Sequence, residues 1–135
     1  FEEIVAIDSM DVGAISPHAL LANLRFKNLT LLVGRSDHIP VINKAEMLGP
    51  YDLIFVDGGH DYETVKKDYE SYINMLSEYG VMAFHDIYSN QHPGCANFWQ
   101  ELKQNISEDW SFKEFVRFDQ YQIFGIGLIS RKIDS

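Results

Sequence analysis

Carboxylates and imidazoles stand where apolar runs of this sequence end. The sequence DGGH, residues 57–60, directly follows one such run, and His85 and Asp86 end another. Two carboxylates can hold an oxygen-preferring cation such as Mg²⁺, and an imidazole can remove a proton from a reacting group near neutral pH. Adjacent glycines let the backbone turn tightly and leave room for a ligand. The pattern predicts a polar site built on strand ends.

Two further apolar runs also finish in polar residues. Asp8 ends the run at residues 3–8, and Ser36 and Asp37 follow the run at 29–34. Polar residues are common wherever a loop begins, so each of them alone is compatible with an ordinary loop. In open α/β sheets, however, ligands bind beyond the carboxyl ends of the strands. We therefore interpret the four strand ends together as one polar rim around one crevice.

Helical patterns separate these runs. A cap at Ser16 with Pro17 after it, and apolar residues at helical spacing, predict helices that alternate with the strands. Alternation of this kind, with nearly unbroken apolar strands, predicts an α/β fold with a mostly parallel sheet covered on both faces. The last two strands have too short a link for a parallel crossover and should form an antiparallel hairpin. The helices are expected at 16–26, 41–48, 61–76 and 96–106, and the strands at 3–8, 29–34, 51–56, 80–86, 112–118 and 122–132.

Composition limits the class of protein. The chain has 135 residues, 46% of them hydrophobic and 23% charged, which suits a single soluble globular domain over residues 1–135. No apolar run approaches the ~20 residues of a membrane span. The single cysteine, Cys95, excludes an internal disulfide and a multi-cysteine zinc site, and we expect a reducing cytoplasm. A net charge of −9 without a basic block argues against a nucleic-acid partner.

The segments TLLVGRSDHIP, YDLIFVDGGHDYE and GVMAFHDI together resemble the class I S-adenosylmethionine-dependent methyltransferases, and most closely their catechol-type and sugar O-methyltransferase branch. The resemblance implies a Rossmann-like sheet and S-adenosylmethionine as cofactor. It assigns the ribose hydroxyls of the cofactor to Asp8 and its adenine to Ser36 and Asp37. The implied substrate is a small molecule or sugar with a methyl-accepting hydroxyl, and a homo-oligomer is compatible with it.

The same resemblance implies a divalent metal, Mg²⁺ or another cation. Its ligands map to Asp57 and Asp86, with His85 as a further candidate, and the general base maps to His60. Imidazole suits that role because it can take the proton as the acceptor oxygen attacks the methyl group. Two other residues near this region receive plainer interpretations: His92 as a loop residue and Cys95 as an inert small residue.

One departure from the family keeps a second reading open. Only seven residues precede Asp8, so the family's Gly-rich cofactor loop and its first strand are expected upstream of this sequence. The leading interpretation is a metal-assisted O-methyltransferase. The alternative is an incomplete or non-catalytic methyltransferase-like module that binds or assembles. A metal-dependent hydrolase is a weaker third reading, because hydrolases usually use more histidine or carboxylate ligands.

Overall fold

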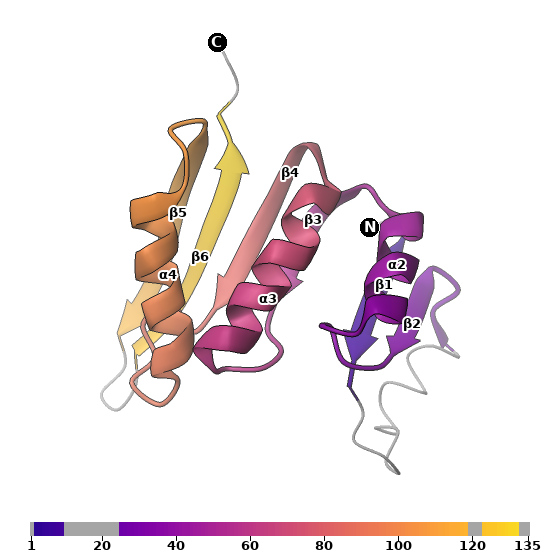
Figure 1. The fold of residues 1–135 in the computed structure, drawn as a ribbon, viewed down its shortest axis with the longest axis horizontal. Helices are drawn as coiled ribbons and strands as arrows, with labels where there is room; N and C mark the ends of the chain where they lie inside the picture. The colour runs from indigo at the N-terminus through magenta and orange to yellow at the C-terminus, as the bar shows by residue number, and fades with distance from the viewer. Residues whose placement is uncertain (1, 10–24, 119–122, 133–135) are drawn as a thin grey trace. The chain divides into compact units, whose positions relative to one another are not determined.

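The computed structural model describes residues 2–9, 25–118 and 123–132. Its contacts divide the chain into two compact units, Phe1–Gly49 and Pro50–Ser135, and each is described by itself (Figure 1). The helix expected over residues 16–26 lies almost wholly outside the described residues. The expectation of one domain over the whole chain stays a prediction.

The described residues of the first unit include two parallel strands and the helix α2. Strand β1 (Ile4–Asp8) pairs with β2 (Leu29–Val33), and α2 (Ile39–Leu48) follows. The helix begins two residues before the predicted start, because Pro40 suits its first turn. A Cβ at Gly34 would lie 2.8 Å from Val41 Cγ2, so this glycine allows α2 to pack tightly behind the end of β2.

Where the structure describes it, the second unit is a four-stranded sheet with two α-helices. Strand β4 pairs in parallel with β3 and antiparallel with β6, and β5 pairs antiparallel with β6, which gives the order β3-β4-β6-β5. The predicted antiparallel hairpin at the carboxyl end is therefore confirmed, and so is the α/β fold class. The elements are β3 (Tyr51–Val56), α3 (Tyr62–Tyr72), the short 3-10 helix η1 (Ile73–Met75), β4 (Leu76–His85), α4 (Pro93–Asn105), β5 (Trp110–Phe118) and β6 (Ile123–Arg131).

Strand β4 begins four residues before the predicted start at residue 80. Helix α3 ends at Tyr72, and β4 already begins at Leu76, so Gly80 lies inside the strand. A Cβ at this position would lie 2.8 Å from the backbone oxygen of Tyr51. Glycine inside a strand commonly marks such a close backbone approach, and the pairing register of β3 with β4 shifts nearby, between Tyr51 and Leu53.

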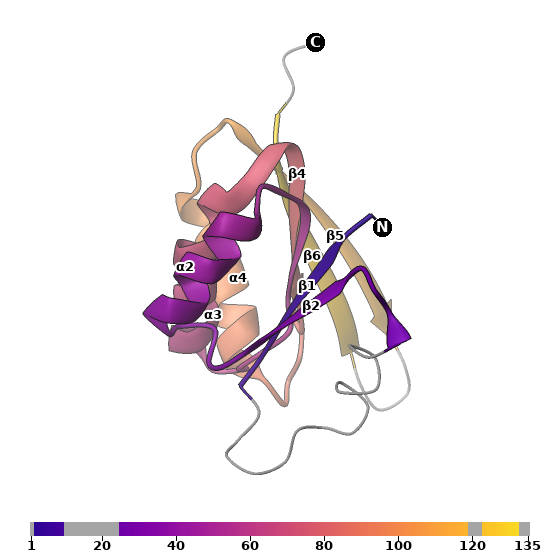
Figure 2. The same ribbon diagram turned by 90° about the vertical axis from the view of Figure 1, so that its right-hand side faces the viewer.

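Helices α3 and α4 cover one face of this sheet (Figure 2). Phe84 of β4 packs there with ring centroids 5.9 Å from Phe98 and 5.7 Å from Trp99, and Trp99 is fully buried. The opposite face exposes large apolar side chains, such as Leu53 and Phe55. Among the described residues of this unit no helix covers that face, so the expected two-sided coverage is not seen there. No described helix has the length and hydropathy needed to span a membrane.

Glu114 of β5 connects α4 to the sheet through hydrogen bonds. Its carboxylate accepts hydrogen bonds from Trp99 Nε1 (2.7 Å), Lys103 Nζ (2.6 Å) and the hydroxyl of Tyr88 (2.8 Å). Burial by itself raises the pKa of Glu114, but the hydrogen bonds from Lys103, Trp99 and Tyr88 outweigh it and lower that pKa below the ordinary 4.5. The ionised carboxylate therefore stabilises the fold.

Replacing Glu114 with glutamine is expected to lower the free energy of unfolding by about 1–2 kcal/mol at neutral pH, because hydrogen bonds to a charged group are stronger. The folded pKa is lowered, so this contribution is complete above 4.5 and is lost as the pH falls below that value. Urea titrations at neutral pH and near pH 3 should show the wild-type advantage shrinking in acid. Glu108→Gln, at an exposed position, is the matched control. An advantage independent of pH would contradict this role of the charge.

Candidate active site

The carboxyl ends of β3 and β4 bring one histidine between two carboxylates. These strands are parallel with Val56 opposite Phe84, so the residues that follow them emerge at the same edge. The Nδ1 atom of His85 lies 3.3 Å from Asp57 Oδ1 and 3.2 Å from Asp86 Oδ1. This nitrogen is shielded from solvent and makes no hydrogen bond of good geometry. The three residues predicted as metal ligands thus lie together.

Asp86 is the centre of the arrangement. It is 7% exposed and has a backbone φ of 60°, the left-handed region that few residues other than glycine adopt. Its second oxygen, Oδ2, lies 3.3 Å from His60 Nδ1 and 3.9 Å from His92 Nε2. One buried carboxylate therefore faces three histidines. Backbone strain of this kind is often retained at functional sites.

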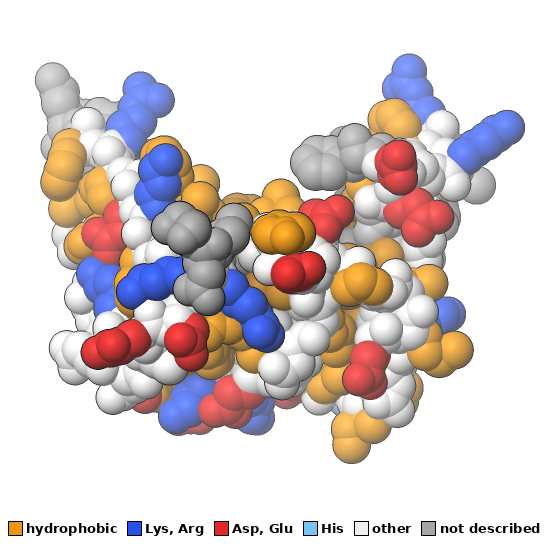
Figure 3. Space-filling model, turned by 90° about the horizontal axis from the view of Figure 1, so that it is seen from above, with side chains coloured by type: hydrophobic (Ala, Val, Ile, Leu, Met, Phe, Trp, Pro, Cys, Tyr) orange, Lys and Arg blue, Asp and Glu red, His pale blue; other side chains and the backbone are white. Residues whose placement is uncertain are grey.

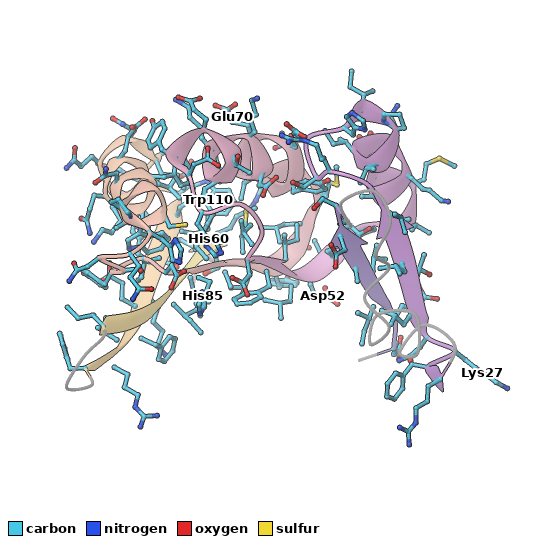
Figure 4. The ribbon with its side chains drawn as sticks, turned by 90° about the horizontal axis from the view of Figure 1, so that it is seen from below. Lys27, Asp52, His60, Glu70, His85 and Trp110 are labelled. Atoms are coloured by element: carbon cyan, nitrogen blue, oxygen red, sulfur yellow. The ribbon has the colours of Figure 1, made fainter. Side chains whose placement is uncertain are left out.

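The loop that carries His60 is fixed by the start of α3. Asp61 caps that helix, accepting hydrogen bonds from the backbone nitrogen (3.0 Å) and the hydroxyl (2.6 Å) of Thr64. Both hydrogen bonds lower the pKa of Asp61, and the bond from the Thr64 hydroxyl has the larger effect. A Cβ at Gly59 would lie 2.5 Å from Thr64 Cγ2, so this glycine makes room for the threonine that donates to the Asp61 cap. Figure 4 shows His60 and His85 near each other on this rim.

His92, which was predicted to be a loop residue, lies against His60. The two imidazole rings stack with centroids 4.1 Å apart and planes 25° from parallel. His92 is the residue before α4, and its position depends on Gly94, where a Cβ would lie 2.7 Å from the backbone oxygen of His60. The signal in the sequence was the HPG triplet after the β4 end, because a glycine in a first helical turn often marks a close backbone approach.

Cys95 is not a nucleophile in this setting. Burial first, and then the negative charges of the nearby carboxylates of Asp86, Asp57 and Asp61, raise the pKa of its thiol to about 11. Thiols react as thiolates, so the expectation of an inert residue agrees with this environment. Its Sγ lies 3.6 Å from the His60 backbone oxygen, a further contact between α4 and the loop.

The residues predicted to bind the cofactor lie in the first unit. Asp8 ends β1 opposite Val33, and its backbone oxygen accepts a hydrogen bond from Gly34 (2.9 Å) just after β2. Ser36 and Asp37 follow in the same turn. Arg35 holds the Asp37 carboxylate with two hydrogen bonds, of 2.8 and 2.9 Å. All three predicted residues therefore lie at the carboxyl end of the two-stranded sheet. That they form one rim with the strand ends of the second unit stays a prediction.

A sequence model of a family described as methyltransferase domain matches residues 2–87, more than half of the chain. The chain belongs to this methyltransferase family. An uncharacterized protein, y4gI of Sinorhizobium fredii (strain NBRC 101917 / NGR234), is 44% identical over 52 residues, which are 38% of this chain and 6% of that protein. The methyltransferase domain thus matches only a small fraction of the length of this curated relative.

Solved structures share the fold of this methyltransferase domain. The O-methyltransferase from Bacillus cereus in complex with SAH has a TM-score of 0.66 and 14% identity, over 97% of this chain and 74% of that one. A putative rRNA-methylase from Clostridium thermocellum has a TM-score of 0.70 and 12% identity, over 96% of this chain and 75% of that one. The MycE methyltransferase from the mycinamycin biosynthetic pathway, in complex with Mg, SAH and mycinamycin VI, has a TM-score of 0.64 and 14% identity. The match covers 96% of this chain and 36% of that one. The predicted methyltransferase family and its Rossmann-like fold are confirmed.

The rim of the methyltransferase domain fits a divalent cation chemically. Asp57 and Asp86 offer carboxylate oxygens from neighbouring strand ends, and both approach the same His85 nitrogen within 3.3 Å. Mg²⁺ prefers oxygen ligands and commonly binds through one or two carboxylates, keeping several waters. The donor set therefore suits such an ion.

Proposed function

We propose that this methyltransferase domain transfers a methyl group from S-adenosylmethionine to a hydroxyl of a small molecule or sugar, assisted by a divalent cation. The observation that carries the proposal is the double use of Asp86. Its Oδ1 points to His85 together with Asp57, and its Oδ2 lies 3.3 Å from His60 Nδ1. One buried carboxylate thereby joins the proposed metal ligands to the proposed base.

His60 is the proposed general base. When its Nδ1 carries a proton toward Asp86, the other ring nitrogen, Nε2, is left to accept the proton of the acceptor hydroxyl, as in other base–carboxylate pairs. The side chain of His60 is 39% exposed, so a substrate can reach it. When bound, Mg²⁺ at Asp57 and Asp86, with His85 as a further candidate ligand, would supply a Lewis acid that favours loss of that proton.

Asp8, Ser36 and Asp37 are the proposed cofactor contacts. A carboxylate at a strand end can accept hydrogen bonds from two neighbouring ribose hydroxyls, which makes a strong, charge-assisted pair. The parallel register of β1 and β2 supports this role, because it places Asp8 and the Ser36–Asp37 turn at the same end of their sheet. The bidentate contact with Arg35 fixes the Asp37 carboxylate in the turn.

A small acceptor is favoured over RNA by charge. The chain has a net charge of −9, and acidic and basic side chains are interspersed on the face seen in Figure 3. Binding to nucleic acid relies on neutralising phosphates with Lys and Arg. Because one of the similar structures is described as a putative rRNA-methylase, RNA is nevertheless included in the test below. A cytoplasmic location and a homo-oligomer remain predictions.

The test follows methyl transfer by the intact protein from S-adenosylmethionine labelled in its methyl group. Catechols, glycosides and ribosomal RNA are offered separately, with Mg²⁺ or with a chelator. We expect labelled catechol or glycoside with Mg²⁺, loss of activity in chelator, and a fall of roughly 100-fold or more in kcat for His60→Gln, the usual contribution of a general base. Full activity in chelator would contradict the proposed role of the metal. Methylation of RNA alone would contradict the proposed small-molecule or sugar acceptor. Cofactor binding without transfer to any acceptor would favour the binding-module alternative.

A further inference from the structure

His60, Asp86 and His92 form a second set of possible metal ligands on this rim. One ligand atom from each residue lies within 4.8 Å of the other two, and within the described parts of the chain this is the group of three that meets that spacing. The set shares Asp86 with the oxygen-rich pair described above. It replaces Asp57 and His85 by two histidines that stack on each other.

Separate contacts hold these three residues together. Gly94 brings the first turn of α4, and with it His92, against the backbone of His60. Cys95 adds a contact from the same turn to the His60 backbone oxygen, at 3.6 Å. Asp86, whose backbone φ is 60°, places its Oδ2 atom 3.3 Å from His60 Nδ1 and 3.9 Å from His92 Nε2. The cluster is therefore built by three segments, the loop after β3, the end of β4 and the start of α4.

We propose that this cluster binds a divalent transition metal such as Zn²⁺. Two imidazole nitrogens and one carboxylate oxygen are ligands that Zn²⁺, Co²⁺ and Ni²⁺ favour, whereas Mg²⁺ favours oxygen. The 3.3 Å between His60 Nδ1 and Asp86 Oδ2 equals the spacing of neighbouring ligands that each lie about 2.0–2.1 Å from one tetrahedral ion. His92 Nε2, at 3.9 Å from the same oxygen, needs only a small approach.

The imidazole rings have room for that approach. The rings stand 25° from parallel, and binding turns them so that one nitrogen of each faces the ion. Each of the two histidine side chains is 39% exposed, so neither ring is locked by packing, while Asp86 is nearly buried and stays fixed. Three protein ligands also leave a fourth position open for water or another small ligand.

Binding at this cluster has a consequence for the proposed function. The transition metal would occupy His60 Nδ1 and Asp86 Oδ2, the two atoms that the proposed base and its carboxylate partner use. The two sets use different oxygens of Asp86, Oδ1 in the oxygen-rich set and Oδ2 in the nitrogen-containing set, but an ion held by His60 Nδ1 stops this imidazole from acting as the base. Zn²⁺ is then an inhibitor of the Mg²⁺-assisted reaction. This consequence rests on the proposed function, but the binding itself does not.

The experiment titrates the intact, metal-free protein with Co²⁺, which reports its ligands by visible absorption, and with Zn²⁺ in competition. We expect one Co²⁺ per chain with the absorption of a low-coordinate site, displaced by Zn²⁺. His92→Gln should weaken binding at least about tenfold, since even outer-shell changes cost 10–100-fold. His38→Gln, at an exposed position in the first unit, is the matched control and should bind Co²⁺ like the wild type. Zn²⁺ should also raise the melting temperature of the wild type more than that of His92→Gln.

Three results would overturn the proposal: no Co²⁺ absorption in the wild type, equal Co²⁺ affinity in His92→Gln, or equal loss in the His38 control. Circular dichroism shows whether His92→Gln is folded, and His92→Asn replaces it if it is not. Asp57→Asn separates the two sites, because it should weaken Mg²⁺-assisted transfer and leave Co²⁺ binding intact. If transfer fails with every acceptor while Co²⁺ binding depends on His92, the proposed function fails and the metal site stands.

Discussion

Asp86→Asn is expected to lower kcat/KM for methyl transfer by at least about 1,000-fold, or ~4 kcal/mol in transition-state stabilisation. The change removes a proposed metal ligand and, at the same time, the carboxylate that orients His60. Loss of a base alone costs about 10²–10⁴-fold, and the lost metal ligand adds to that. The measurement is the initial rate with labelled S-adenosylmethionine over a range of Mg²⁺ and acceptor concentrations.

Asparagine is a suitable replacement because it removes the charge of Asp86 without disturbing the backbone. Asparagine tolerates a positive φ as aspartate does, so the backbone at φ 60° is not strained further. The control is Asp52→Asn, which removes a charge at the opposite end of β3 (Figure 4). The Asp52 carboxylate accepts a hydrogen bond from the Ser77 hydroxyl (2.6 Å), and an amide oxygen can accept the same bond. If Asp86→Asn retains more than about a tenth of the wild-type rate, Asp86 does not join the metal to the base.

Gly94→Ala is expected to destabilise the protein by about 2–3 kcal/mol and to lower its melting temperature by roughly 10 °C. The added Cβ would meet the backbone nitrogen of Tyr62 and lie 2.7 Å from the His60 backbone oxygen. Backbone atoms cannot move aside as a flexible side chain can, so α4 must shift away from the loop. The shift would separate His92 from His60 and should also weaken the Co²⁺ binding proposed above.

Gly58→Ala is the matched control for this clash. It lies in the same loop, and its added Cβ would meet only Asp68 Oδ2, at an ordinary 3.7 Å. Its effect on stability should stay within about 0.5 kcal/mol. Thermal melts of the two variants followed by circular dichroism compare them directly. Equal stability of Gly94→Ala and wild type would show that α4 does not depend on this close approach.

The rim of β3 and β4 could be predicted because it follows from local pattern and one general rule. Apolar runs that end in Asp57 and in His85-Asp86 identify two strand ends, and parallel neighbours must end at the same edge. The identities of the acids and of His60 then suggested the chemistry through the resemblance. A single polar residue at a strand end is compatible with an ordinary loop. What indicated a site was that several strand ends carry polar residues together.

The sequence by itself therefore determined the alternation of strands and helices and the antiparallel hairpin, because each is encoded within a few neighbouring residues, whereas the roles predicted for the ligands and the base came from the resemblance. Only the tertiary structure decided that Gly80 lies inside a strand, that Asp86 adopts a positive φ, and that His92 stacks on His60. The stacking of His92 on His60 depends on how α4 lies on the sheet, where its buried Phe98 and Trp99 pack against Phe84 of β4. Packing between segments far apart in the chain depends on many side chains at once, so no short stretch of sequence carries it.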